Sequence, residues 1–116
     1  FPKLQDAITR KHQNWLEWAQ NGWLNALAPM TLTSDTTVIA TDTQTMRQIT
    51  TVPVITGIFG PFNGNSATQI LQQVWAAFNS GAQGIALFDT AHFTPSMAKA
   101  LAASGSIKNR ADHPKP

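Results

Sequence analysis

Three short apolar runs recur along this chain at intervals of about thirty residues, and this spacing restricts the fold more than any other feature. The runs begin at Trp23, Pro53 and Gly84, so the intervals are 30 and 31 residues. Between the runs, apolar residues repeat with helical periodicity rather than with alternation. A strand followed by a helix at each repeat is typical of a parallel α/β protein. We therefore predict three consecutive βα units.

The repeat length matches that of a TIM (β/α)8 barrel, in which about 250 residues divide into eight units of about 31. With 116 residues the chain is too short to close such a barrel. Because the pattern begins and ends with a helix, we assign residues 1–105 to strands six to eight of an incomplete barrel. The alternative is an independently folded small α/β domain. Residues 106–116 contain two prolines and three Lys or Arg, which predicts a flexible tail or linker.

The first half of the chain contains one clear helical pattern and one weak one. Apolar residues over 4–19 form a single stripe, and Gly22 is suited to end that helix. The run after it includes Pro29, which has no N–H for a ladder and is expected at a strand terminus or bulge. Residues 34–50 are rich in threonine, which disfavours a helix, yet Asp42 permits a short capped one.

The second half has stronger helix signals. Ser66 followed by Gln69 forms a capping box at the start of a helix that Gly81 ends. Thr94 and Pro95 are suited to begin a last helix, which Gly105 closes. The chain opens directly into a helix, with no initial Met and no signal-peptide pattern, as an excised or processed product would.

The composition excludes several classes of function. Charged residues make up 12% of the chain, about half the typical share, and Thr, Gln, Asn and Ser take their place. The eight Lys and Arg are scattered rather than gathered on one face, which argues against a nucleic-acid partner. There is no cysteine, so disulfides and thiolate metal sites are excluded. No apolar stretch reaches 18 residues, so we predict no membrane span.

The active site of a (β/α)8 barrel lies at the carboxyl ends of its strands, which directs attention to the residues that follow each run. Asp89 is the leading catalytic candidate because it ends an apolar strand, and His92 could orient it or carry a proton. Asp35 is a second carboxylate, although a helix cap is its alternative role. Candidates for substrate binding are the aromatic and amide residues of the same loops, namely Phe59, Phe62, Asn63 and Phe93.

Metal, phosphate and cofactor sites are not predicted. The three histidines are far apart in the sequence, and none has a second ligand at helical spacing. The glycine-rich loop after the second run has no Gly-Lys-Ser/Thr pattern, and no lysine or arginine occurs between Gln48 and Ala98. The helical spacing of Trp15 and Trp18 predicts that these two tryptophans pack in the core, although an exposed tryptophan could stack on a sugar.

The chain resembles the late part of a bacterial barrel family in segments 14–18 and 22–30, at Pro53 and Gly57, and over residues 69–88. This family is the glycosyl-hydrolase-like (β/α)8 group often described as family 10 glycosylhydrolase, with many cyanobacterial members. The resemblance implies a hydrolase acting on a polysaccharide or cell-wall glycan, in a secreted or periplasmic location. Asn25 and Leu32 depart from the family pattern, which tends to have Asp and Tyr at these positions.

The second run has no glutamate at its end, where the large clan of retaining barrel glycosidases carries its nucleophile. We therefore expect this segment to be inactive alone and the catalytic carboxylates to lie elsewhere in a full barrel. The alternative is a non-catalytic carbohydrate-binding or assembly protein. The expected partners are a carbohydrate and either the rest of the barrel or a second copy, which would cover the open sheet edges.

Overall fold

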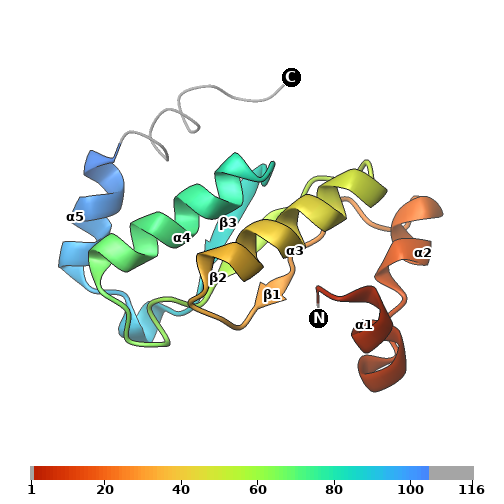
Figure 1. Cartoon of the computed structure of the whole chain (residues 1–116), viewed down its shortest axis with the longest axis horizontal. Helices are drawn as coiled ribbons and strands as arrows, with labels where there is room; N and C mark the ends of the chain where they lie inside the picture. The colour runs from red at the N-terminus through yellow and green to blue at the C-terminus, as the bar shows by residue number, and fades with distance from the viewer. Residues whose placement is uncertain (1, 105–116) are drawn as a thin grey trace.

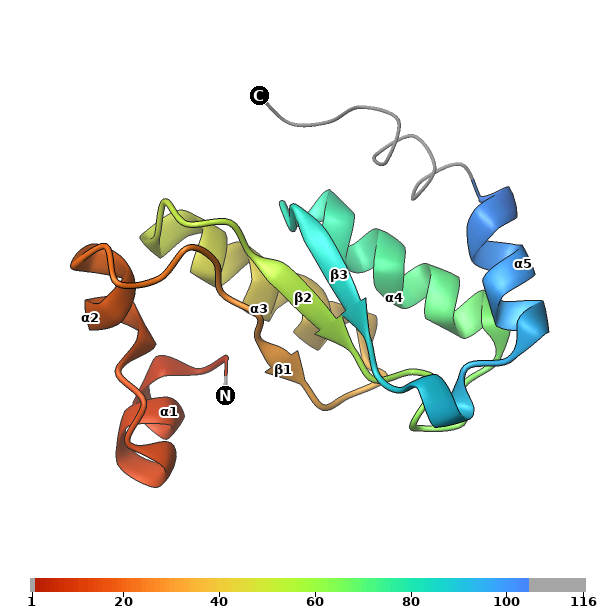
Figure 2. The ribbon, with the colours of Figure 1, turned by 180° about the vertical axis from the view of Figure 1, so that it is seen from behind.

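The computed structural model describes residues 2–104, which form a three-stranded parallel sheet with helices on one face and beside its edges (Figures 1 and 2). In chain order the elements are α1 (Leu4–Lys11), α2 (Trp15–Gln20), β1 (Met30–Thr31), α3 (Thr36–Ile49), β2 (Ile55–Ile58), α4 (Ala67–Asn79), β3 (Gly84–Leu87), the 3-10 helix η1 (Thr90–His92) and α5 (Pro95–Ala103). A helix follows each strand, so the predicted α/β class and the three βα units are confirmed. The predictions for Gly105 and the tail at 106–116 lie outside the described residues.

The sheet places all three strands side by side in sequence order, β1-β2-β3, with every pair parallel. Gly57 at the centre lies opposite Met30 on one side and Ala86 on the other. Parallel pairing brings the three carboxyl ends to the same end of the sheet, as Figure 1 shows. The residues that follow each strand therefore share one end of the molecule.

Helices α3 and α4 cover one face of the sheet, and the view from behind shows the other face without a helix over it (Figure 2). The covered face forms the main core, whose fully or nearly buried residues are Ile39, Ile58, Ile70, Val74, Ala77, Ala82 and Leu101. Side chains that point the other way remain accessible, with Met30 52% and Phe88 42% exposed. A second core lies under α1 and α2 and includes Ala7, Trp15, Leu27, Met46 and Val54.

The prediction of one helix over residues 4–19 is wrong, because two helices occupy this stretch. α1 ends at Lys11, and the next residue, His12, adopts the left-handed conformation with φ of 55°. α2 then begins with Asn14 as its cap, whose side chain accepts a hydrogen bond from the N–H of Glu17. The Asn14 amide also donates to the Glu17 carboxylate at 2.8 Å. This reciprocal pair begins the second helix after the break.

The prediction of a first strand over the whole apolar run at 23–30 is also wrong. Only Met30–Thr31 form a strand, preceded by a single bridge between Leu27 and Val54. Pro29 lies between the two, and its missing N–H interrupts the ladder, which is the strand-terminus role expected of it. The second and third strands lie within their predicted runs.

The threonine-rich stretch forms α3, a helix of 14 residues rather than a short one beginning near Asp42. The helix starts with Asp35 as its cap, whose carboxylate accepts from the N–H of Thr37 at 2.8 Å. Thr41 and Thr45 each donate a hydrogen bond to the carbonyl four residues earlier. Packing of α3 against α4 and the sheet outweighs its low intrinsic propensity. The predicted caps of α4 and α5, at Ser66 and Thr94, are confirmed.

Candidate functional site

The loop after β2 folds back over the end of β3, and main-chain hydrogen bonds fix it there. The N–H of Phe62 donates to the carbonyl of Phe88 at 3.1 Å. The N–H of Asn63 donates to the carbonyl of Phe59 at 2.9 Å. The loop therefore holds its side chains against the residues that follow β3, at the carboxyl end of the sheet.

Four rings lie in a row at this end of the sheet. The rings of Phe59 and Phe88 are 4.7 Å apart between centroids, and Phe62 meets Phe88 edge-on at 5.5 Å. Phe62 also contacts the ring of His92 edge-on at 5.4 Å. Phe59 is buried, whereas Phe62 and His92 are exposed. The row thus runs from the sheet interior to the surface and presents apolar ring area to solvent.

Asp89 and His92 form a hydrogen-bonded pair beside this row. Asp89 lies two residues after the end of β3 and caps η1 by accepting the N–H of His92 at 3.2 Å. The same carboxylate oxygen, Oδ1, lies 2.5 Å from Nδ1 of His92. The hydrogen bond from the His92 side chain holds the pKa of the Asp89 carboxyl below its ordinary value. Asp89 therefore stays ionised near neutral pH, which suits it to orient His92 or accept a hydroxyl proton, and not to act as a general acid.

A chain of uncharged side chains extends the site toward β1. Ser34, in the loop after β1, donates to Oδ1 of Asn65 at 2.7 Å, and Asn63 donates to the Ser34 hydroxyl at 3.3 Å. Gln73, from α4, donates its amide to the same Asn65 oxygen at 2.8 Å. The chain joins both loops to the helix, and its exposed members supply neutral donors and acceptors.

Gln73 and Phe88 also contribute to this end of the sheet, although neither was predicted as a site residue from the sequence. Gln73 is 1% exposed, and its Oε1 is packed so close to Gly60 that an added Cβ there would lie 2.4 Å from it. Phe88 joins Phe59 to Phe62. Phe88 could have been predicted as a site residue, because it is the aromatic residue near the end of the third apolar run. The position of Gln73, seven residues inside a helix, gave no comparable signal.

The sequence-predicted residues thus divide into two groups. The first group lies together at one end of the sheet and consists of Asp89, His92, Phe59, Phe62 and Asn63. The carboxylate of Asp35 serves as the cap of α3. The side chain of Phe93 is partly buried and packs against the main core. These last two residues therefore have clear structural roles where they stand.

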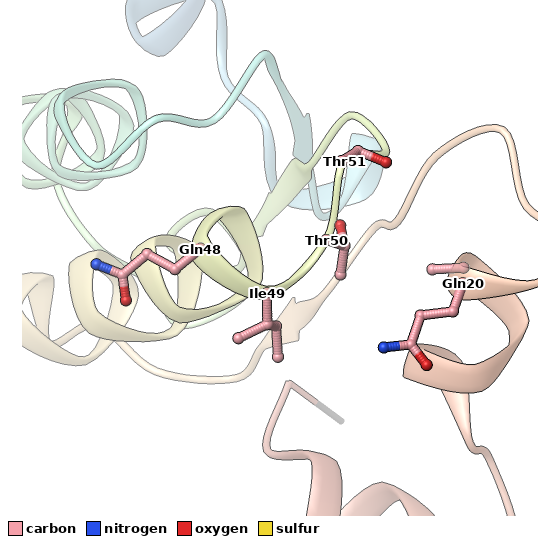
Figure 3. A pocket seen from close by; sticks show the side chains of 6 residues that line it. Gln20, Gln48, Ile49, Thr50 and Thr51 are labelled. Atoms are coloured by element: carbon pink, nitrogen blue, oxygen red, sulfur yellow. The ribbon is translucent and has the colours of Figure 1, made fainter.

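A separate hollow of about 200 Å³ lies at the amino end of the sheet, between the end of α2 and the turn that precedes β2. Figure 3 shows Gln20 of α2 on one side of it and Ile49 with Thr50 on the other. Its side chains are neutral, and it lies at the opposite end from the ring row. Within residues 2–104, no three His, Asp or Glu side chains are placed to hold a metal ion. The helices described there are all too short or too polar to cross a bilayer.

Comparison of the chain with protein-family models, with curated proteins and with solved structures gives no significant match. Any function proposed for this chain therefore rests on the geometry of this end of the sheet and on the sequence pattern.

Proposed function

We propose that this chain is the C-terminal part of a glycoside hydrolase-like (β/α)8 barrel and forms one wall of a carbohydrate-binding cleft. The observation that carries the proposal is the row of rings formed by Phe59, Phe88, Phe62 and His92 beside an uncharged hydrogen-bonding chain. A sugar ring offers apolar C–H faces that stack on aromatic rings and hydroxyl groups that pair with amides. Both kinds of partner occur here together, at the end of the sheet that barrels use for their sites.

The arrangement supports a binding wall rather than a complete catalytic centre. Glycoside hydrolysis ordinarily uses two carboxyl groups, of which the acid needs a raised pKa. Asp89 has a lowered pKa, and the Asp35 carboxylate caps its own helix. We therefore infer that the chain alone does not hydrolyse glycans and that its role in a barrel is to bind and position substrate.

A non-catalytic carbohydrate-binding protein is the second candidate. The observation in its favour is that Asp89 is engaged by both the main chain and the ring of His92. A carboxylate held in this way is suited to a fixed contact with a sugar hydroxyl. The two candidates differ in the residues that would face Asp89 across the cleft.

The test is a titration of the isotope-labelled 116-residue chain with neutral oligosaccharides, namely cello-, chito- and xylo-oligomers, followed by amide chemical shifts. We expect shifts at Phe62, Asn63 and His92, and we expect Phe62→Ala to weaken binding by tenfold or more. Trp75→Ala is the matched control, because Trp75 is equally exposed, 51% against 52%, but lies on α4 away from the ring row. If none of these oligomers shifts the site amides, the carbohydrate proposal is wrong.

Hydrolysis is measured in parallel by the release of reducing ends from the same oligomers. We expect none from the 116-residue chain. Turnover by this chain that Asp89→Asn abolishes would contradict the inference that it lacks a catalytic pair.

A further inference from the structure

The ring row at the carboxyl end of the sheet is accessible through two phenylalanines. Phe62 is 52% exposed and Phe88 is 42% exposed, whereas Phe59 behind them is buried. The face of an aromatic ring carries a partial negative charge, and it attracts a cation that lies within about 6 Å of the ring centroid. The exposed rings therefore favour a positively charged group over a negatively charged one.

A carboxylate lies at the exposed end of this row. The side chain of Asp89 is 29% exposed, and that of its partner His92, which contacts Phe62, is 49% exposed. Both hydrogen bonds from His92 are accepted by Oδ1, so the pair does not use the second oxygen, Oδ2. Because hydrogen bonds between charged groups are stronger than those between neutral ones, an ammonium group at Oδ2 would bind more strongly than a hydroxyl group.

The loops at this end of the sheet contain no Lys or Arg that could neutralise the carboxylate. The three loops span residues 32–35, 59–66 and 88–94, and their only charged residues are Asp35 and Asp89. An anionic ligand would therefore approach charges of its own sign, and a cationic ligand would approach charges of the opposite sign.

The Lys and Arg side chains of the described residues lie away from the ring row. Asp6 and Asp42 line a hollow of about 250 Å³ at the carboxyl end of β1, and Lys3 lines the same hollow. Arg47 lies at the amino end of the sheet, where it donates to the segment just before β3 at 3.1 Å. Lys99 lies on α5, which starts beside η1 and runs back toward the amino end (Figure 2). The other two are in the last turn of α1, on the far side of β1 from β3 (Figure 2).

We propose that this site prefers glycan units that carry a positively charged nitrogen, such as the protonated amino group of a deacetylated amino sugar. The sugar ring stacks on Phe62 and Phe88, and the charged nitrogen lies between the Phe62 ring and the Asp89 carboxylate. A neutral sugar makes the same stacking contacts but leaves the Asp89 charge without a counter-charge. This inference rests on the proposed carbohydrate binding and deepens it by naming the charge of the ligand.

The test is a titration of the isotope-labelled 116-residue chain with four ligands at pH 8, where an ordinary histidine is neutral. The N-acetylated chitin tetramer is neutral, and the N-trimethylated chitosan tetramer has the same backbone with permanent positive charges. The galacturonic acid tetramer is negatively charged, and tetralysine is a cation without a sugar. We expect the trimethylated tetramer to bind at least fivefold more tightly than the N-acetylated one, and the galacturonate to bind more weakly than both.

Two matched variants identify the carboxylate that is responsible. Asp89→Asn removes the charge but keeps the size of the side chain, and we expect it to bring the affinities for the trimethylated and N-acetylated tetramers close to equality. Asp35→Asn removes a carboxylate from the loop after β1 and keeps a side chain that can cap α3, so we expect most of the preference to remain. Amide spectra verify that both variants are folded, and the comparison of ligands on the unaltered chain needs no variant.

Each contrary result has a distinct meaning. Equal affinity of the unaltered chain for the N-acetylated and trimethylated tetramers would overturn this inference while the carbohydrate site stands. An equal loss of preference in Asp89→Asn and Asp35→Asn would assign it to the general charge of this end and overturn the role given to Asp89. Tetralysine that binds more tightly than the trimethylated tetramer would make a basic peptide the ligand. If no sugar tetramer binds, the proposed function is itself wrong, and this inference with it.

Discussion

Thr43 on α3 and Thr56 on β2 face each other in the core, and their hydroxyl groups are joined by a hydrogen bond of 2.8 Å. Both side chains are fully buried. The pair ties the helix with the weakest sequence signal to the central strand of the sheet. A polar link of this kind fixes the register of α3 as well as its contact with the sheet, because a shifted helix would leave a buried hydroxyl unpaired.

The first prediction concerns this pair. Thr56→Val should lower the free energy of unfolding by about 1–3 kcal/mol, because it leaves the Thr43 hydroxyl buried without its partner. The double variant Thr43→Val/Thr56→Val should cost less than the sum of the two single changes, since it removes both polar groups. Urea denaturation of the four proteins measures the coupling. Strictly additive costs would show that the two hydroxyls do not interact, and Thr41→Val at an exposed position serves as the control.

The second prediction concerns the close contact of β2 with the segment before β1. A Cβ added at Gly57 would lie 2.8 Å from the carbonyl oxygen of Pro29, so Gly57→Ala must displace main chain. We expect a cost of about 1–3 kcal/mol. Gly84→Ala is the matched control on the neighbouring strand, because its Cβ would meet Ile55 at an ordinary 3.5 Å. Equal thermal stability of the two variants would contradict the packing described for Gly57.

The third prediction separates the cap role of Asp35 from a catalytic one. Asp35→Ala should destabilise the chain by about 1 kcal/mol, because the N–H of Thr37 loses its acceptor. Asp35→Asn should cost much less, since an Asn side chain caps a helix as well as Asp does. Thermal unfolding measures both variants. If Asp35→Asn keeps its stability but loses glycan binding, the Asp35 carboxylate contacts the ligand and the cap is not its main role.

The fourth prediction is the titration of Asp89. The hydrogen bond from His92 keeps the folded-state pKa of this carboxyl below its ordinary value of 3.8. The stabilisation from the pair is therefore present above pH 3.8 and is lost as the pH falls through the folded-state pKa. Carboxyl ¹³C shifts followed from pH 6 to 2 should show this lowered pKa, and His92→Gln should raise it. An Asp89 titration that the His92 change does not move would contradict the pairing.

The fifth prediction has the opposite sign and concerns Asp42, whose pKa burial raises above 3.8. The Asp42 carboxyl therefore binds its proton more tightly in the folded chain than in the unfolded chain. This preferential proton binding stabilises the fold below pH 3.8, and the stabilisation is lost as the pH rises through the folded-state pKa. Asp42→Asn should therefore raise the melting temperature at neutral pH, with a gain that shrinks toward pH 3.

The control for this change is Asp6→Asn, because Asp6 lines the same hollow but lies in the first turn of α1. A negative charge at that position interacts favourably with the helix dipole, so its removal should not stabilise the chain. A neutral-pH gain of equal size in both variants would show that relief of general charge repulsion, not burial of Asp42, is the cause.

Much of the fold could be predicted because local signals and the repeat agreed. The capping box at Ser66 and the Thr94-Pro95 start are short-range features, and both appear where expected. The break at His12 was missed because the apolar stripe continues across it, while the signal that mattered was the Asn14–Glu17 pair. The length of α3 was missed because its stability comes from packing against α4 and the sheet, which intrinsic propensity does not report.

The sequence could predict which residues lie at the strand ends, but not which of their side chains contact one another. Parallel strands bring their carboxyl ends together, so Asp89, Phe59 and Phe62 could be grouped in advance. Which side chains engage one another depends on how the loop after β2 folds, and that is set by main-chain bonds to residues distant in sequence. Gln73 belongs to the site because its amide donates a hydrogen bond to Asn65, a contact that no local sequence pattern predicts.

Oδ1 of Asn65 accepts hydrogen bonds from Ser34 and from Gln73, and this shared acceptor has a consequence for motion. The loop after β1, the loop after β2 and the body of α4 are connected at one atom. Neither loop can swing outward alone without breaking a bond to the other or to a buried amide. This end of the sheet should therefore meet a ligand as a rigid surface, without a loop that opens or closes over it.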